Sequence, residues 1–454
     1  MNFLSIDPAS GEKLKEYPVW DAARLEQALA MTAAATPAWN TRTSGERAAL
    51  LRRAGEVLLG HRDEYAALMS REMGKLITEA RAEIEKCARC CAFYADEAAN
   101  LLADEAARTD AVKSYVTYQP LGTLLAIMPW NFPFWQVIRA AAPALAAGNT
   151  MVLKHADNVP GCALALEEVF HQAGFPVGVL QTLMLGIPQV ESVIKDARVH
   201  AVTLTGSERA GRAVARQAGE VLKKCVLELG GSDAFVVLED ADLAKAAEAG
   251  VKSRYQNGGQ SCIAAKRFIL VEKVAAAFLR EFRARAAALI CGDPLDAGTT
   301  LAPMARFDLR DALHKQVQDA LAKGAKALLG CEPLPGRGAF YPASILDGVK
   351  PGMRAWTEEL FGPVALVIRV RDEEEALQVA NGSPYGLGGS VWTRDPARGE
   401  AFARRLQSGS AFVNGLVKSD PRLPFGGVKH SGYGRELARH GIHEFTNVKT
   451  VWIG

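Results

Sequence analysis

A cysteine that follows a glycine-rich turn is the strongest candidate nucleophile in this sequence. Residues 257–262 read Asn-Gly-Gly-Gln-Ser-Cys, and Ile263-Ala264-Ala265 after them predict a helix start or a tight loop. Glycines let a backbone approach a ligand closely, and free N–H groups beside a thiol favour its anion. Cysteines beside glycines also occur in ordinary turns. The pattern alone therefore leaves a catalytic and a structural Cys262 equally open.

Glu228 and Asn131 are further candidates, each at the end of a predicted strand. Glu228 closes the apolar run CVLE, where a carboxylate either activates water or caps the next segment. Asn131 follows the apolar run 124–128 in the segment PWNFP. It fits the N-cap of a helix whose first turn holds Pro133. Each residue thus has a structural explanation beside the catalytic one.

A helix that continues from Asn131 would place Asn131, Trp135 and Arg139 on one face, at intervals of four residues. An amide, an indole and a guanidinium would then point the same way.

Two blocks of alternating strands and helices must position these residues. Residues 20–105 have the apolar spacing of successive amphipathic helices. The predicted strands of the first block are 124–128, 150–155, 181–185, 200–206 and 223–229. A second block starts near residue 231. The alternation predicts doubly wound parallel sheets, which bind ligands at the carboxyl ends of their strands. Residues 206–211 form a glycine-rich turn before a helix and suit a pyrophosphate, although the full Gly-x-Gly-x-x-Gly spacing is absent.

Two further segments, 112–122 and 445–453, alternate like edge strands but have no evident partner in either block. They predict an arm that completes a sheet on another subunit of a homodimer or homotetramer.

Composition places the chain among globular proteins and argues against several functions. Its 454 residues suggest two or three domains, and 53 basic against 51 acidic residues give a net charge of +2. This balance gives no support to nucleic-acid or polybasic membrane binding. The sequence has no targeting peptide or long apolar span, so we expect a cytoplasmic protein without membrane association. The eight cysteines lack disulfide spacing, and Cys87, Cys90 and Cys91 fit a helix core better than a metal site.

Ten segments, in order along essentially the whole chain, resemble motifs of the aldehyde dehydrogenase superfamily. They are PWNFP (129–133), LKHAD (153–157), GFPVGV (174–179), TLTGS (203–207), ELGG (228–231), NGGQSC (257–262), ELFGPV (359–364), NGSPYGL (381–387), FVNG (412–415) and PFGGVKHSGYGRE (424–436). The resemblance implies an α/β fold in three parts. These are a Rossmann-type NAD-binding domain (1–110 and 124–230), an α/β catalytic domain (231–430) and a small oligomerisation arm (111–123 and 431–454).

The resemblance also implies a reaction, in which Cys262 attacks an aldehyde carbonyl. The Asn131 amide and the Cys262 backbone N–H would hold the oxyanion, a donor pair typically worth a few kcal/mol. Collapse of this adduct would reduce a nicotinamide and leave a thioester, which Glu228 would help to hydrolyse. Glu228 favours release of a free acid over acyl transfer to coenzyme A.

The cofactor contacts implied by the resemblance are Trp130, Asn131, Lys154, Asp157, Gly206, Ser207, Leu229, Glu359 and Phe361. Lys154 and Asp157 would face the adenosine ribose, and Glu359 the nicotinamide ribose. A carboxylate at Asp157 would repel a 2'-phosphate and favour NAD, while Lys154 leaves NADP open. His155 stands where the family has a small residue or proline, and the sequence does not explain it.

Arg139 would lie along the channel to Cys262, where its charge needs an anionic partner. That partner is either a substrate carboxylate or a carboxylate of the protein. Trp135, Arg139 and Ser419 resemble the carboxylate-binding set of the short succinate-semialdehyde dehydrogenases. We therefore expect oxidation of succinate semialdehyde, with NAD and water, to succinate.

Three alternatives remain open at this point. One is a broader aldehyde dehydrogenase that uses medium-chain or aromatic aldehydes. Another is a hydrolase that pairs Cys262 with a histidine such as His430, which leaves Asn131 and Glu359 without a role. The last is a catalytically silent protein that keeps the fold.

Overall fold

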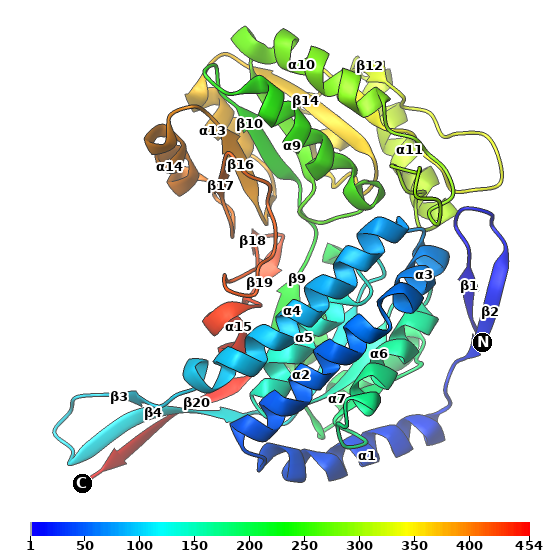
Figure 1. The fold of residues 1–454 in the computed structure, drawn as a ribbon. Coiled ribbons are helices and arrows are strands. Elements are labelled where there is room, and N and C mark those ends of the chain that lie inside the picture. The colour runs from blue at the N-terminus through cyan, green and yellow to red at the C-terminus, as the bar shows by residue number, and fades with distance from the viewer. Residues whose placement is uncertain (1) are drawn as a thin grey trace.

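The computed structural model describes residues 2–454, and Figure 1 shows a body of two parts with a projecting arm. The lower part in this view is built on a six-stranded sheet in the order β19-β9-β8-β5-β6-β7. Its strands are β5 (Thr123–Met128), β6 (Thr150–His155), β7 (Leu180–Thr182), β8 (Val199–Thr205), β9 (Lys224–Glu228) and β19 (Gly432–Tyr433). The strands β5 to β9 run parallel, while β19 is antiparallel to β9.

Helices cover both faces of this sheet, which explains why its strands are apolar at nearly every position. Leu124 and Ala126 pack with α2 to α6 on one face, and Leu125 packs with α1, α7 and α8 on the other. The helices are α1 (Ala22–Asn40), α2 (Ser44–Gly60), α3 (Arg62–Met73), α4 (Ile77–Leu101), α5 (Trp135–Ala146), α6 (Pro160–Gln172), α7 (Ile187–Lys195) and α8 (Glu208–Glu220). No helix within residues 2–454 combines the length and apolar character needed to cross a membrane.

The upper part in Figure 1 contains a seven-stranded sheet in the order β12-β13-β14-β11-β10-β16-β17. Its strands are β10 (Asp233–Val237), β11 (Ala265–Val271), β12 (Lys326–Leu329), β13 (Ser344–Asp347), β14 (Val364–Val370), β16 (Gly389–Trp392) and β17 (Phe412–Val413). The helices of this part are α9 (Leu243–Tyr255), α10 (Glu272–Ala287), α11 (Phe307–Ala322), α12 (Arg354–Thr357), α13 (Glu373–Asn381) and α14 (Pro396–Arg405). The hairpin of β1 (Asn2–Ile6) and β2 (Lys13–Pro18), and the short pair β15 (Tyr385–Gly386) and β18 (Val428–Lys429), complete the body.

The arm is a three-stranded sheet in the order β20-β4-β3. It consists of β3 (Glu105–Ala106), β4 (Lys113–Pro120) and β20 (Thr446–Ile453). The two strands that lacked a partner in the sequence therefore pair with each other, along their whole length. Figure 1 shows this sheet extending away from the body, with β20 along one edge.

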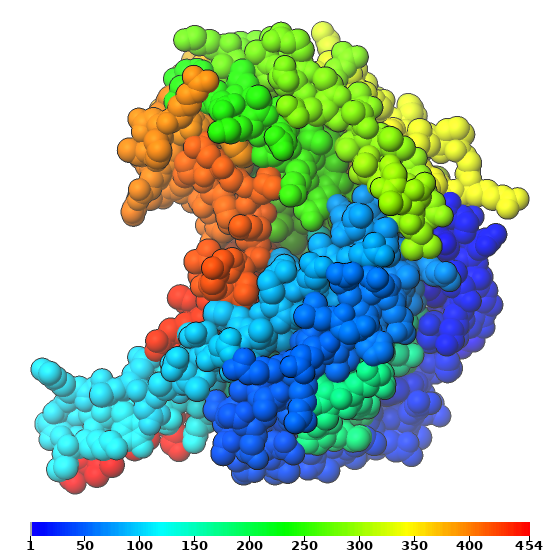
Figure 2. All heavy atoms as spheres, in the orientation of Figure 1, coloured from blue at the N-terminus to red at the C-terminus, as the bar shows by residue number. Residues whose placement is uncertain are grey.

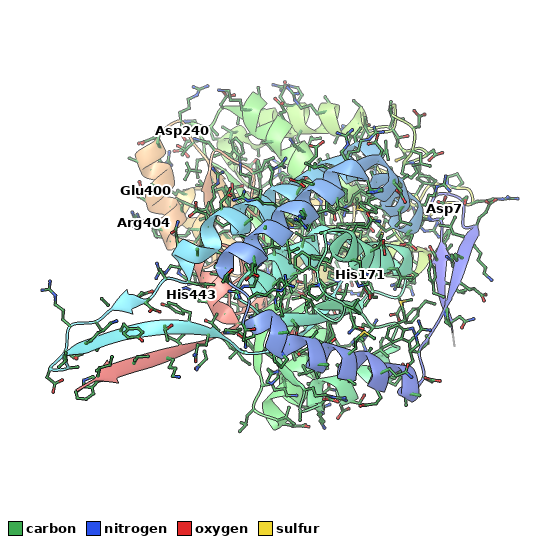
Figure 3. All side chains as sticks on the ribbon, turned by 60° about the horizontal axis from the view of Figure 1, so that its bottom comes forward. Asp7, His171, Asp240, Glu400, Arg404 and His443 are labelled. Atoms are coloured by element: carbon green, nitrogen blue, oxygen red, sulfur yellow. The ribbon has the colours of Figure 1, made fainter. Side chains whose placement is uncertain are left out.

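The expected limits of the arm need correction at both of its ends. Its sheet already begins at Glu105, while Gly432 and Tyr433 form β19 and pair with β9 in the six-stranded sheet. The following helix α15 (Ala438–Glu444) packs on α4 and α5. In Figure 3 the labelled His443 of this helix lies where the arm joins the body, and its ring stacks on Tyr118 of β4 at 3.9 Å.

The expected N-cap of α5 is also wrong. The helix begins at Trp135, so Asn131 lies in the loop before it. The reason is a tertiary contact, because the buried Glu83 carboxylate of α4 accepts the N–H groups of Phe134 and Trp135 at 3.0 and 2.9 Å. Glu83 thus caps the N-terminus of α5, and Asn131 has no capping role.

Candidate active site

The site segments meet at the carboxyl ends of the parallel strands. The chain runs from β5 outward to β6 and β7, then returns to add β8 and β9 on the other side of β5. A crevice forms where this direction reverses, and ligands of doubly wound sheets bind there. The loop 129–134 follows β5, Gly206 follows β8, and Glu228 is the last residue of β9.

The loop that carries Cys262 is held by backbone geometry. A short 3-10 turn (Gln256–Gly259) precedes it, with left-handed backbone at Asn257, Gly258 and Gly259. A Cβ on Gly259 would come within 2.5 Å of the backbone of Gly362, so only glycine fits. Cys262 is followed by β11, and the tight-loop prediction for this segment is the one that agrees with the structure.

Cys262 is one of only two partly exposed cysteines among the residues described; the other is Cys291. Burial of the sulfur raises the pKa of Cys262 to about 12, while the charges of Lys266 and Arg139 act in the opposite direction. Its backbone N–H has no acceptor within residues 2–454. The loop therefore offers a thiol beside a free backbone donor.

Lys266 is a neighbour of the thiol that sequence reasoning missed. Its ammonium is fully buried and donates to the carbonyls of Ser261 and Cys262, both at 2.7 Å. It also forms an ion pair with Glu359 at 2.9 Å. The only signal in the sequence was a pair of basic residues, Lys266 and Arg267, at the start of the apolar run of β11, which an edge position would explain as well.

Asn131 is tied to the Cys262 loop from both of its ends. Its side-chain Nδ2 donates to the Gln260 carbonyl at 3.1 Å, and its own carbonyl accepts from Asn257 Nδ2 at 2.7 Å. One of the two Nδ2 hydrogens remains available for a ligand. The structure thus brings Asn131 and the Cys262 loop together.

His155 now has a structural explanation. Its Nε2 lies 2.9 Å from the Pro133 carbonyl, and its Nδ1 accepts the N–H of Ala156 at 2.8 Å. Burial lowers the pKa of His155 to about 4, so the ring is neutral. It ties the end of β6 to the loop that carries Asn131.

Glu228 is a buried carboxylate that receives no hydrogen bond from the described residues. The residue is 2% exposed, and neither carboxylate oxygen has a hydrogen-bond partner within residues 2–454. Burial, followed by the neighbouring Glu436 carboxylate, raises the pKa of Glu228 well above its ordinary value. An unpartnered buried carboxylate with a raised pKa is suited to general-base work on water.

Arg139 does not have the free charge that we expected. Its guanidinium forms an ion pair with Glu436, donates to Thr205 Oγ1 at 3.2 Å and lies over the Phe425 ring at 4.6 Å. Arg139 and Glu436 are 2% and 4% exposed. Of the two partners that the sequence left open, the structure has the carboxylate of the protein. The expected role of Arg139 toward a substrate carboxylate stays a prediction, for a guanidinium that already has a carboxylate partner in the protein.

The other two residues of the expected substrate set lie together, and Lys86 of α4 joins them. Lys86 Nζ donates to Ser419 Oγ at 2.6 Å and lies 4.0 Å from the centroid of the Trp135 ring. Sequence reasoning missed Lys86, because nothing in the helical pattern of α4 marks it out.

Three of the residues expected to bind the cofactor follow β8 and β9, at the carboxyl ends of these strands. Ser207 caps α8, and the Gly206 N–H donates to the Glu228 carbonyl at 3.0 Å. Leu229 packs against Gly211 of α8, where a Cβ would come within 2.6 Å of it. The backbone donors at the start of α8 suit a pyrophosphate, which a dinucleotide carries.

The remaining residues expected to bind the cofactor make contacts of their own within the protein. Lys154 forms an ion pair with Asp157 and donates to the His155 carbonyl at 2.8 Å. Glu359 accepts the Gly231 N–H at 3.1 Å. The Trp130 and Phe361 rings meet edge to face at 5.8 Å. The carboxylates of Asp157 and Glu359 can accept hydrogen bonds from ribose hydroxyls, and the start of α8 can bind a pyrophosphate. Together these groups fit a dinucleotide.

Comparison with known proteins agrees with this geometry. The chain matches the aldehyde dehydrogenase family over residues 1–451, and it belongs to that family. It is 50% identical over 449 residues to the succinate semialdehyde dehydrogenase [NAD(P)+] Sad of Escherichia coli, covering 99% of this chain and 97% of that protein. It is 47% identical over 458 residues to a succinate-semialdehyde dehydrogenase [NADP(+)] of Mycobacterium ulcerans, with all of both chains covered.

A solved structure gives the same result for the fold. The succinic semialdehyde dehydrogenase of Streptococcus pyogenes in complex with NADP+ superimposes with a TM-score of 0.97 at 38% identity, over 99% of each chain. The predicted α/β fold, with its Rossmann-type and catalytic parts, and the predicted family are confirmed.

Proposed function

We propose that the protein oxidises succinate semialdehyde to succinate with NAD(P) and water. The observations that support this proposal are the hydrogen bond from Asn131 to the Cys262 loop and the position of Glu228 at the carboxyl end of β9, in a chain 50% identical to a succinate semialdehyde dehydrogenase. A hydrolase with Cys262 and His430 has less support, because His430 is exposed and lies 3.5 Å from Glu208 of α8.

In the proposed reaction the Cys262 thiol loses its proton to solvent, its sulfur forms a bond to the aldehyde carbon, and the carbonyl oxygen gains the electron pair. The free Nδ2 hydrogen of Asn131 and the Cys262 N–H stabilise that oxygen. Lys266 orients the thiol loop through two carbonyls. A bound nicotinamide, with its ribose at Glu359, would supply the acceptor for the hydride of the aldehyde carbon.

The thioester that results is hydrolysed by water. Glu228 removes a proton from this water, the water oxygen bonds to the acyl carbon, and the Cys262 sulfur leaves as the C–S bond breaks. The buried, unpartnered carboxylate supports this role. For Glu228→Gln we expect one equivalent of NADH per site in a rapid burst, followed by turnover at least about 100-fold slower. A burst that is reduced as much as the steady-state turnover would contradict the role of Glu228 in hydrolysis.

NAD is the preferred cofactor in this proposal, and NADP is accepted. Asp157 places a carboxylate beside Lys154, where a 2'-phosphate would add a second negative charge. The protein then acts in the cytoplasm, as a homodimer or homotetramer joined through the arm. The exposed Val448 and Trp452 on the edge strand β20 support an association surface there.

A broader aldehyde dehydrogenase is the second candidate, and the pairing of Arg139 with Glu436 favours it. The test is a panel of succinate semialdehyde, butanal and benzaldehyde with NAD and with NADP, followed by NADH or NADPH absorbance. The proposal requires kcat/KM for succinate semialdehyde to exceed that for butanal at least about tenfold, the value of one charge-assisted contact. Equal kcat/KM values for the two aldehydes would contradict the proposal and support the broader aldehyde dehydrogenase.

A further inference from the structure

A cavity of about 840 Å³ lies where α4, the loop before α5 and residues 418–422 meet. In Figure 2 the orange-red surface of the latter segment borders the blue-cyan surface of α4. Phe132 and Gln256 contribute to the wall. Each directly adjoins a residue of the active site, Phe132 next to Asn131 and Gln256 next to Asn257. The cavity therefore lies against the two segments that hold the proposed nucleophile and oxyanion donor.

The acidic side chains of this wall are already engaged. Glu83 pairs with Lys75, Asp96 with Arg52 and Asp420 with Arg422, while Glu79 accepts the N–H of Asn257. By contrast, Lys86, Arg89, Lys252 and Lys418 of the same wall have no carboxylate within 4.0 Å among residues 2–454. The uncompensated charge of the cavity is positive, which attracts an anionic ligand.

Lys86 is the most constrained of these cations. Ser419 Oγ takes one of its three N–H donors, and the Trp135 ring lies beneath the ammonium. Half-buried among these groups, Lys86 has a pKa lowered to about 8, chiefly by burial and then by the charge of Arg139, while Glu83, Cys87 and Cys90 act in the opposite direction. Two donors remain for a ligand, and a carboxylate would supply the missing counter-charge.

We propose that Lys86 binds the distal carboxylate of the aldehyde substrate, with Ser419 and Trp135 holding its ammonium in place. This inference rests on the proposed oxidation of a carboxylate-bearing aldehyde. It assigns the recognition of the substrate charge to α4, since Arg139 is committed to Glu436. Lys86 is thus a specificity-determining residue of the substrate channel.

The test compares succinate semialdehyde with butanal, a four-carbon aldehyde without the carboxylate. Lys86→Met should raise the KM for succinate semialdehyde about 10- to 100-fold, the usual effect of losing one charged hydrogen bond, with kcat changed less than about threefold. The KM for butanal should stay within about twofold. Lys86→Arg, which keeps the charge, should recover most of the loss. Arg81→Met is the matched control, because Arg81 lies on the same helix but pairs with Asp63 outside the cavity.

Thermal melting with succinate provides a second measurement. Succinate should raise the melting temperature of the wild type but not that of Lys86→Met, and Lys86→Gln serves if the methionine variant does not fold. An unchanged KM for succinate semialdehyde, or an equal rise for both aldehydes, would overturn the assignment of Lys86. A wild type that does not prefer succinate semialdehyde to butanal would instead overturn the proposed function itself.

Discussion

Arg139 and Glu436 form a buried ion pair beside Glu228, and the two charges act on Glu228 in opposite directions. The Glu436 carboxylate raises the pKa of Glu228, and the Arg139 guanidinium lowers it. Burial is the largest cause of the raised pKa of Glu228, and the pair adjusts the pH at which Glu228 becomes a base. It joins α5 to a residue that follows β19, so the fold itself fixes this balance.

The pH profile should respond to either half of the pair. Activity that needs the ionised Glu228 increases as pH rises through its pKa. Glu436→Gln removes a negative neighbour and should move the acid limb of kcat to lower pH by about one unit. Arg139→Met should move it to higher pH. Steady-state rates from pH 5 to 9, with melting curves to establish folding, check both shifts. A shift of the acid limb in the same direction in both variants would refute the electrostatic explanation.

The cofactor preference should depend on Asp157. Asp157→Ala removes the carboxylate that faces a 2'-phosphate and frees Lys154 from its ion pair. We expect kcat/KM for NADP to rise about tenfold relative to NAD, because one like-charge contact is lost. Kinetics with both dinucleotides measure this ratio. Asp311→Ala, at an exposed carboxylate of α11, is the control that should leave it unchanged.

The turn before Cys262 should not accept any side chain at Gly259. Its left-handed backbone and the approach of Gly362 predict that Gly259→Ala lowers the free energy of unfolding by about 2 kcal/mol and reduces kcat. Gly45→Ala in α2 meets no atom within 4 Å and should be neutral or slightly stabilising. Chemical denaturation of both variants gives the comparison. Equal stability would show that the turn relaxes at no cost.

The edge of the arm should govern assembly. Trp452 is 54% exposed on β20, and Trp452→Glu would place a charge on the proposed contact surface. We expect light scattering to report a smaller particle at micromolar concentration, with an unchanged circular dichroism spectrum. The same change at another exposed apolar residue, Leu222→Glu, should leave the particle size unaltered.

Local patterns predicted much of this molecule. The glycines before Cys262, the apolar strand that ends at Glu228 and the alternation of strands and helices all lie within short segments. Their physical requirements are therefore visible in the order of the residues. The resemblance to the family added the division into a Rossmann-type part and a catalytic part.

Contacts between distant parts of the chain were the ones that sequence reasoning could not supply. Glu436 pairs with Arg139 across nearly three hundred positions, and Glu83 replaces Asn131 as the cap of α5. The arm strands β4 and β20 likewise pair with each other from distant parts of the chain. Each of these contacts depends on which of several possible partners the tertiary structure brings near, and single-residue chemistry does not distinguish among them.

The position of Lys266 links two functions that are separate in the chain. One ammonium contacts the carbonyl of Cys262 and the carboxylate of Glu359, so the two groups share a single support. Displacing Glu359 would loosen the support of the thiol at the same moment. The rate at which an alkylating reagent labels Cys262 is consequently a gauge of what happens at Glu359.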